Sequence, residues 1–167
     1  MIYWLTGQPG AGKTTLGNWL MAALQGDAVL VDGDDIREIF DNKDYSEQGR
    51  RKNIELAQNI AHFLHKKKMN PVVCLVSPYK DQRENFKQKM GEDIVELYIH
   101  TSEIRGRESF HVGGYEKPLE NFIDVNTTDK KVFDTIFDED GVVETCETCC
   151  GAMEKEAGTT AQVFAYI

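Results

Sequence analysis

The sequence predicts an α/β fold in which helices cover both faces of a parallel sheet, a three-layer α/β/α arrangement. Two observations carry this prediction. Short apolar runs alternate along the chain with stretches whose apolar residues recur every three or four positions, as on one face of a helix. A glycine-rich segment also follows the first apolar run directly. Strands that alternate with helices form parallel sheets, which bind ligands at the carboxyl ends of their strands.

The expected elements follow one another closely through the first hundred residues. Each strand is an apolar run, and glycine or proline separates it from its neighbours, as Gly26 and Pro71 do. Polar residues follow the second strand, so a polar connection is expected there. In chain order the elements are a strand at 2–5, a helix at 13–24, a strand at 28–31, a helix at 50–68, a strand at 72–76, a helix ending near 91 and a strand at 94–99.

The last third of the chain carries a weaker pattern. Residues 101–120 read as a connection, 122–125 as a fifth strand, and 129–137 as a last helix that Thr128 would cap. We therefore expect one domain over residues 1–137, followed by an acidic, cysteine-containing tail at 138–167. This tail would either be flexible or add a late strand.

Residues 7–14, GQPGAGKT, match the pattern G-x-x-x-x-G-K-[ST] between an expected strand and an expected helix. Glycines let the backbone N–H groups turn toward phosphate oxygens, and the helix N-terminus adds a favourable dipole. This context predicts a P-loop NTPase-type sheet rather than a glycine turn in a protein that binds no phosphate. The expected nucleotide-binding residues are Gly7, Gly10, Ala11, Gly12, Lys13, Thr14 and Thr15.

The nucleotide is expected to be ATP with Mg²⁺. Lys13 would reach the β and γ phosphates, and the hydroxyl of Thr14 would bind the metal. No guanine-reading N-K-x-D sequence is evident, which favours ATP. Asp32 and Asp34 follow the second strand, and if the strand conformation continues there, both carboxylates point to one side. Carboxylates in that place hold magnesium or accept a proton, unless they belong to a solvated Asp-Gly turn.

Four arginines lie nearest the expected strand ends. Arginine suits phosphate or sulfate because its planar fork gives two charge-assisted hydrogen bonds. We expect two or three of them to bind an acceptor, although any single one could be a solvated helix residue. The four are Arg37, Arg50, Arg51 and Arg83.

The chain resembles the adenylylsulfate kinases, which phosphorylate the 3'-hydroxyl of adenosine 5'-phosphosulfate with ATP. Four segments carry the resemblance in the family's order, and a looser match follows, so that it covers roughly residues 2–118. The combination is far more specific than the phosphate loop alone. The segments are GQPGAGKTT from Gly7, VDGDDIR from Val31, YSEQGRRKN from Tyr45 and SPYKDQR from Ser77, with FHVGGYEKP from Phe110 as the looser match.

The resemblance implies roles for individual residues. Asp34 would be the base toward the ribose hydroxyl, and Asp32 would support the magnesium shell. The phosphosulfate end would be bound by Arg37, Arg50 and Asn53.

Three further residues take their implied roles from the same resemblance. Tyr45 and Phe110 would stack on the two faces of the acceptor's adenine, although core packing is an alternative for both rings. Ser77 matches the family's phosphoserine, although a serine in a strand-end turn is the alternative, since direct transfer needs no covalent intermediate.

One departure from the family lies after the fourth expected strand. The family has a longer insertion there, with an R-D-x-K-G-L-Y pattern that closes over both nucleotides. This chain has only HTSEIRGRES at residues 100–109, in which Arg105 and Arg107 could supply the positive charge of such a lid. The departure keeps two alternatives open: a P-loop kinase for another acceptor, such as a nucleoside, nucleotide, sugar or polynucleotide end, or a nucleotide-binding module without catalytic activity.

Charge and hydropathy restrict the partners and the location. Net charge is −9, of which −6 falls in residues 138–167, so no basic face suggests a nucleic-acid partner. No apolar run approaches the roughly 18 residues of a membrane span, and no secretion signal is evident. Cys74 lies inside an apolar strand, where a buried thiol is usual. We therefore expect a cytoplasmic protein, and a homodimer by analogy with the family.

The three tail cysteines, Cys146, Cys149 and Cys150, form a C-x-x-C-C sequence. A closed structural zinc site takes about four ligands, and no histidine follows His111. Reactive surface thiols or a disordered acidic tail are favoured over a metal site.

Overall fold

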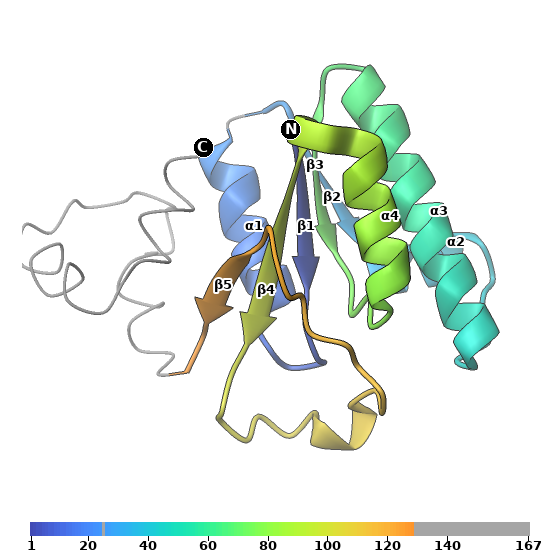
Figure 1. The fold of residues 1–167 in the computed structure, drawn as a ribbon, viewed down its shortest axis with the longest axis vertical. Helices are drawn as coiled ribbons and strands as arrows, with labels where there is room; N and C mark the ends of the chain where they lie inside the picture. The colour runs from blue at the N-terminus through green and yellow to red at the C-terminus, as the bar shows by residue number, and fades with distance from the viewer. Residues whose placement is uncertain (25, 129–167) are drawn as a thin grey trace, which may run out of the picture.

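The computed structural model describes residues 1–24 and 26–128, which form a five-stranded parallel sheet in the order β2-β3-β1-β4-β5 (Figure 1). The strands are β1 Ile2–Thr6, β2 Ala28–Asp32, β3 Asn70–Cys74, β4 Ile94–His100 and β5 Ile123–Asn126. The helices are α1 Lys13–Ala23, α2 Gly33–Ile39, α3 Glu47–Lys66 and α4 Lys80–Met90, with 3₁₀ turns η1 Gly91–Asp93 and η2 Glu108–Phe110.

The central strand β1 explains the position of the glycine-rich loop. It pairs in parallel with β3 on one side and β4 on the other, and all five of its residues are buried. Burial on both faces is the reason that its sequence shows no alternation of polar and apolar residues. Because every pairing is parallel, the segments after the strands gather at one edge of the sheet.

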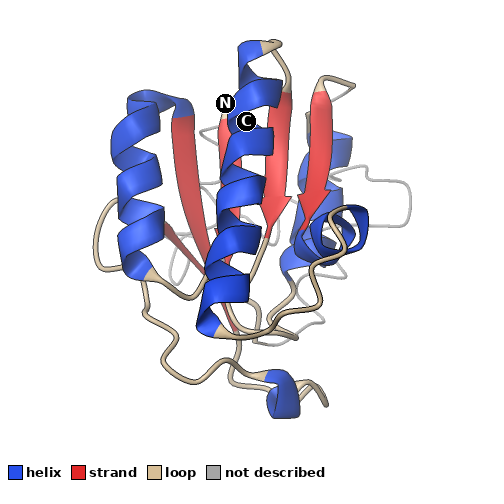
Figure 2. Cartoon of the chain, turned by 90° about the vertical axis from the view of Figure 1, so that its right-hand side faces the viewer, coloured by secondary structure: helices blue, strands red, loops and turns tan. Residues whose placement is uncertain are grey.

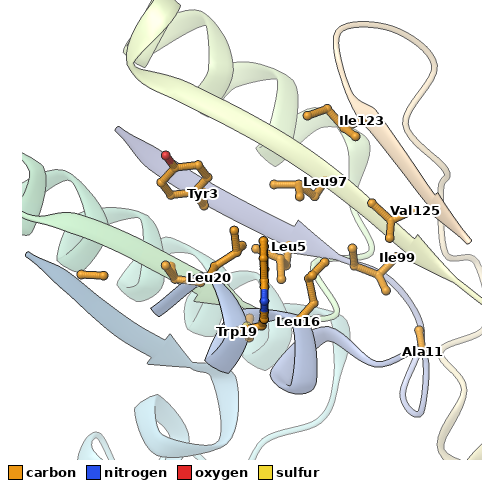
Figure 3. Packing of buried hydrophobic residues seen from close by; sticks show 13 residues of the cluster. Tyr3, Leu5, Ala11, Leu16, Trp19, Leu20, Leu97, Ile99, Ile123 and Val125 are labelled. Carbon is orange, nitrogen blue, oxygen red and sulfur yellow. The ribbon is translucent and has the colours of Figure 1, made fainter. Parts of the chain in front are cut away.

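Helices cover both faces of this sheet, which confirms the three-layer prediction. Helix α1 lies on one face, and α3 and α4 lie on the other, the face that is turned to the viewer in Figure 2. On the α1 side, Leu16, Trp19 and Leu20 pack against strand residues such as Leu5 and Ile99 (Figure 3). The core on the opposite side includes Trp4, Val31, Ile54, Ala57, Val73 and Phe86.

The condition under which Asp32 and Asp34 would point to one side as on a strand is not met. The strand conformation does not continue through residues 32–35, because α2 begins at Gly33. Asp32 caps this helix: its side chain accepts a hydrogen bond from the backbone N–H of Asp34. The acidic sequence is typical of a helix start, since an aspartate cap and acids in the first turn both favour the helix dipole. Strand geometry therefore does not place the two carboxylates on one side.

Two element boundaries also differ from the expected ones. Helix α3 begins at Glu47 instead of residue 50, because the Ser46 side chain accepts a hydrogen bond from Gly49 N and caps it. Strand β3 begins at Asn70 and includes Pro71, which is in register with Val29 of β2. A proline is tolerated near the start of a strand.

The connection between β4 and β5 has η2 as its only helix, and it packs back against the sheet. The Tyr115 ring stacks on Tyr98 of β4 with 6.1 Å between ring centres, and the Tyr115 hydroxyl lies 2.8 Å from Thr6 Oγ1. Within residues 1–24 and 26–128, no helix is long and apolar enough to cross a membrane. The expected helix at 129–137, the tail at 138–167 and its three cysteines lie outside the described residues.

Candidate active site

A cavity of about 1170 Å³ opens at the carboxyl edge of the sheet. It is lined by the glycine-rich loop after β1, by the start of α2 after β2, by the turn after β3 and by residues from the connection after β4. In Figure 1 this connection runs beyond the arrowheads of β1 and β4. The strand order thus brings the sequence-predicted phosphate loop, acids and aromatic residues into one cavity.

The glycines of the phosphate loop are required by its geometry. A Cβ atom at Gly7 would lie 2.0 Å from the carbonyl oxygen of Ile99, so no side chain fits there. Gly12, the N-cap of α1, has a φ of 102°, which L side chains rarely adopt. These constraints turn the loop tightly between β1 and α1 and leave the helix N-terminus facing the cavity.

Lys13 lies across the loop at the first position of α1. Its ammonium group donates hydrogen bonds to the carbonyl oxygens of Gly7 and Gln8, each at 2.9 Å. Burial lowers the pKa of Lys13 to about 8, and the nearby carboxylates of Asp32 and Asp34 oppose this shift. A buried ammonium held only by neutral carbonyls is poised to bind an anion, since an anion would offset the cost of its burial.

Thr14 and Asp32 form the pair that fits magnesium. Thr14 Oγ1 donates to Asp32 Oδ2 at 3.1 Å, which joins the phosphate loop to the start of α2. Among the described residues, no group of three or more His, Cys, Asp or Glu could hold a metal. A hydroxyl and one carboxylate beside a phosphate loop nevertheless suit Mg²⁺, which binds few protein oxygens and takes its other ligands from phosphates and water.

Asp34 stands in the first turn of α2 and its side chain is exposed at the cavity. Asp32, in contrast, uses its two oxygens for Thr14 and for the backbone of Asp34. The two carboxylates therefore occupy different environments. Asp32 is held between α1 and α2, whereas Asp34 is open to a ligand in the cavity.

The structure separates the four arginines into two pairs. Arg37 and Arg50 line the cavity. The Arg37 guanidinium donates to the carbonyl oxygens of Asn42 and Asp44, and its central carbon lies 4.2 Å from the centre of the Tyr45 ring. Arg37 is thus fixed beside an aromatic ring at the cavity.

Arg51 and Arg83 are held by other partners. Arg51 forms ion pairs with Glu47 at 2.9 Å and Asp81 at 2.8 Å. Arg83 is 2% exposed: its Nε pairs with Glu96 at 2.7 Å, and its two terminal nitrogens donate to the carbonyls of Ser77 and Glu116. Arg83 therefore shapes the turn after β3 from within the core, a role that arginine spacing in the sequence does not reveal.

Two buried polar residues face the same cavity. Asn53 is 4% exposed; its Nδ2 donates to Gly33 O at 3.1 Å, and its Oδ1 has no hydrogen-bond partner among the described residues. Ser77 is 1% exposed, has a φ of 43°, and its hydroxyl also lacks a partner there. Buried polar atoms are nearly always hydrogen-bonded, so both atoms call for a polar ligand or water.

Two aromatic rings stand exposed at the cavity, with 60% of Tyr45 and 64% of Phe110 accessible. Core packing, the alternative for these rings, is thereby excluded. Tyr45 comes from the loop before α3, and Phe110 ends η2 in the connection after β4. Two exposed rings that line one cavity can stack on a flat aromatic ligand.

The two arginines of the short connection have different surroundings. Arg105 donates to Gly10 O at 3.2 Å and to Thr127 Oγ1 at 3.1 Å, and it pairs with Glu103 at 2.7 Å. Arg107 is exposed and lies beside Gly10. A Cβ atom added to Gly10 would lie 3.0 Å from the Cβ atom of Arg107. Arg105 therefore fixes the connection to the phosphate loop, while Arg107 is open to a ligand.

Thr127 is a supporting residue that no sequence pattern indicated. It follows β5, is 5% exposed, and donates from its hydroxyl to Ala11 O at 2.7 Å. The same oxygen accepts from Arg105, so Thr127 joins the phosphate loop to the connection. A threonine after a strand has no distinguishing signal in a single sequence.

Comparison with known proteins agrees with this geometry. The family model "Adenylylsulphate kinase" matches residues 1–135. An adenylyl-sulfate kinase from Pseudomonas aeruginosa is 31% identical over 137 residues, which are 75% of this chain and 69% of that protein. A cytidine diphosphoramidate kinase from Campylobacter jejuni is 29% identical over 132 residues, 75% of this chain and 77% of that protein.

Solved structures show the same fold. The APS kinase CysC of Mycobacterium tuberculosis, solved with AMPPNP and APS, superimposes with a TM-score of 0.64 over 81% of this chain and 96% of that one, at 18% identity. The hexameric APS kinase of Thiobacillus denitrificans gives a TM-score of 0.57 over 73% of this chain and 24% of that one, at 24% identity. With a family model matched over most of its length, the chain belongs to the adenylylsulfate kinase family of phosphotransferases, which act on a hydroxyl group.

Proposed function

We propose that this protein transfers the terminal phosphoryl group of Mg-ATP to the 3'-hydroxyl of adenosine 5'-phosphosulfate. The observation that carries the proposal is the composition of the cavity. Its wall brings together the phosphate loop with Lys13, the exposed rings of Tyr45 and Phe110, and Arg37 of α2 beside the Tyr45 ring. A cavity of about 1170 Å³ is large enough for two ligands side by side.

The nucleotide side would bind and neutralise the triphosphate. The loop N–H groups and the N-terminus of α1 would hold phosphate oxygens. Lys13 would leave its carbonyl partners for the β and γ phosphates, and Thr14 and Asp32 would hold the metal. A magnesium ion there supplies positive charge to the phosphate oxygens. Most of the catalysis in such a transfer comes from this positioning and charge stabilisation.

Asp34 is the proposed base. Its carboxylate is exposed at the cavity, two residues beyond Asp32, whose side chain bonds to Thr14 next to the phosphate loop. A carboxylate in this place orients the acceptor hydroxyl and accepts its proton as the new O–P bond forms. Asp32 would keep the start of α2, and with it Asp34, in place through its bond to Asp34 N.

The acceptor side would bind a nucleotide by its base and its anionic end. Tyr45 and Phe110 would stack on the adenine, a contact that favours any flat aromatic base. Arg37 and Arg50 would bind the phosphosulfate oxygens with charge-assisted hydrogen bonds. The unpartnered Asn53 Oδ1 lies in the cavity wall and would accept a hydrogen bond from the acceptor.

For Ser77 we propose a positioning role in the cavity wall. Its residue is 1% exposed, and its carbonyl accepts hydrogen bonds from Arg83 and Thr6. A hydroxyl this enclosed is poorly placed to carry a phosphoryl group, whereas direct transfer needs no such intermediate. Ser77→Ala is therefore expected to keep most of the wild-type rate, and loss of activity together with a phosphate on Ser77 would contradict this role.

Another acceptor nucleotide is the second candidate. It is favoured by the similarity to a cytidine diphosphoramidate kinase and by the stacking side, which does not by itself distinguish adenine from cytosine. The third candidate, a nucleotide-binding module without catalysis, is favoured only by the short connection after β4.

An acceptor panel tests the proposal. ADP formation is measured with Mg-ATP and adenosine 5'-phosphosulfate, cytidine diphosphoramidate, adenosine or cytidine as the acceptor. We expect the highest kcat/KM with adenosine 5'-phosphosulfate, and loss of turnover in Lys13→Ala. Faster turnover of another acceptor would support the second candidate, and nucleotide binding without turnover of any acceptor would support the third.

A further inference from the structure

The phosphate loop is joined to the aromatic acceptor side by the side chain of one of its own residues, Gln8. The carboxamide of Gln8 makes two hydrogen bonds with the backbone of Val112: its Nε2 donates to Val112 O at 3.0 Å, and its Oε1 accepts from Val112 N at 2.9 Å. The same residue's carbonyl accepts from Lys13. Gln8 thus contacts both the phosphate-binding lysine and the connection after β4.

The position of Phe110 depends on such anchors. Its ring is exposed, and its backbone N–H bonds only within its own turn, to Arg107 O at 3.0 Å. Three links to the phosphate loop flank this turn: Arg105 to Gly10 on one side, and His111 to Pro9 and Val112 to Gln8 on the other. The His111 link is one residue from Phe110 but is a single exposed hydrogen bond, whereas the paired Gln8 link is two residues away and the Arg105 link five.

The Gln8 link is also more enclosed than the adjacent His111 contact. Val112 is 9% exposed and Gln8 is half-buried, so both hydrogen bonds are partly buried. The neighbouring contact from His111 Nε2 to Pro9 O, at 3.2 Å, is exposed. A paired amide that exchanges two hydrogen bonds with one residue fixes orientation as well as distance, because both bonds must be kept at once.

We propose that Gln8 is a positioning residue, which holds the Phe110 segment over the phosphate loop and so sets the distance between the acceptor base and the transferred phosphate. The inference rests on the proposed function for its kinetic consequence. Gln8 acts through Val112 and needs no contact with either substrate. Its loss would weaken acceptor binding while leaving the loop backbone, which binds ATP, in place.

The test uses Gln8→Met, which keeps the length and flexibility of the side chain and removes both hydrogen bonds. Gln58→Met is the matched control, because Gln58 also donates to a backbone carbonyl, that of Gln82 at 3.0 Å, but lies outside the cavity wall. Three quantities are measured for wild type and both variants: hydrogen exchange of the Val112 amide by NMR, the Kd of a non-hydrolysable ATP analogue, and kcat and KM for the acceptor.

We expect Gln8→Met to speed exchange of the Val112 amide and to raise the acceptor KM about tenfold, with a smaller change in kcat and an analogue Kd within about twofold of wild type. Gln58→Met leaves all of these unchanged. Equal Val112 exchange in Gln8→Met and wild type would overturn the anchor. Faster exchange with an unchanged KM, or a parallel loss of ATP affinity, would overturn the positioning role.

Failure of the proposed function gives a different result. If wild type does not turn over adenosine 5'-phosphosulfate, the proposed acceptor is wrong. The exchange rate of the Val112 amide in Gln8→Met still decides whether Gln8 anchors this segment.

Discussion

Gly17 and Cys74 offer a quantitative test of how α1, and with it the phosphate loop, is seated on the sheet. A Cβ atom at Gly17 would lie 2.5 Å from Cys74 Sγ and 3.2 Å from Leu30 Cδ1. Cys74 is 3% exposed, and its thiol lies 3.4 Å from Lys13 O, the first residue of α1. Gly17→Ala must therefore move either the sulfur or the helix.

The magnitude follows from two opposing effects. Overpacking a core costs about 1–3 kcal/mol, whereas alanine in place of glycine inside a helix contributes about 1 kcal/mol of stability. Gly17→Ala is thus expected to lower the free energy of unfolding by about 0–2 kcal/mol in the wild-type background. In a Cys74→Ala background the clash with sulfur is absent, and the same substitution becomes neutral or stabilising.

Urea unfolding of the four proteins in this double-mutant cycle measures the coupling. We expect an interaction energy of about 1–3 kcal/mol between the two sites. Agreement of the Gly17→Ala effect in the two backgrounds to within about 0.5 kcal/mol would refute the close packing of α1 on β3. Where Gly17→Ala lowers the free energy of unfolding, we expect it to weaken ATP binding as well, because a shift of α1 also displaces Lys13.

Three further predictions concern the chemistry of the site and the core beneath it. Asp34→Asn is expected to lower kcat by a factor of about 10²–10⁴ with little change in ATP affinity. Steady-state kinetics measures kcat and calorimetry measures the affinity. A kcat of the variant equal to that of wild type would show that Asp34 is not the base. Burial places the Lys13 pKa at about 8, so ATP binding near that pH should take up protons, because phosphate charge raises the pKa of the ammonium. Calorimetry in two buffers of different ionisation enthalpy measures this uptake, and affinity should fall as pH rises above 8. Glu96→Gln leaves Arg83 without its buried ion-pair partner and is expected to cost about 3–5 kcal/mol of unfolding free energy, whereas a cost below about 1 kcal/mol would show that the pair is not buried.

The sheet could be predicted from the sequence because each strand is a continuous apolar run. Strands buried on both faces, such as β1, leave an unmistakable hydrophobic pattern. Helix α2 was not predicted, because its seven residues, GDDIREI, are too few for a periodic pattern and contain a glycine and two aspartates that read as a turn. Its only signal was the capping position of Asp32, before acids in the first turn.

The residues of the candidate site could be predicted where they depend on the local sequence, but not where they depend on contacts with distant segments. The phosphate loop was predictable because its glycines follow from local geometry, whereas the partners of Arg83 depend on a strand and a loop that are distant in sequence. Glu96 and Glu116 lie 13 and 33 residues beyond Arg83, and no spacing rule connects them. Gln8 and Thr127 were missed for the same reason, since each acts on a segment about a hundred residues away.

The central claim is transfer of phosphate from ATP to the 3'-hydroxyl of adenosine 5'-phosphosulfate, and phosphorus NMR of the reaction products tests it most directly. The protein is incubated with Mg-ATP and adenosine 5'-phosphosulfate, with Asp34→Asn and Lys13→Ala as controls. We predict a new phosphomonoester signal on the 3' position in wild type, formed in step with ADP and strongly reduced in both variants. Two results would contradict the account. One is ADP formation without a 3'-phosphorylated product, and the other is ATP binding with no conversion of adenosine 5'-phosphosulfate.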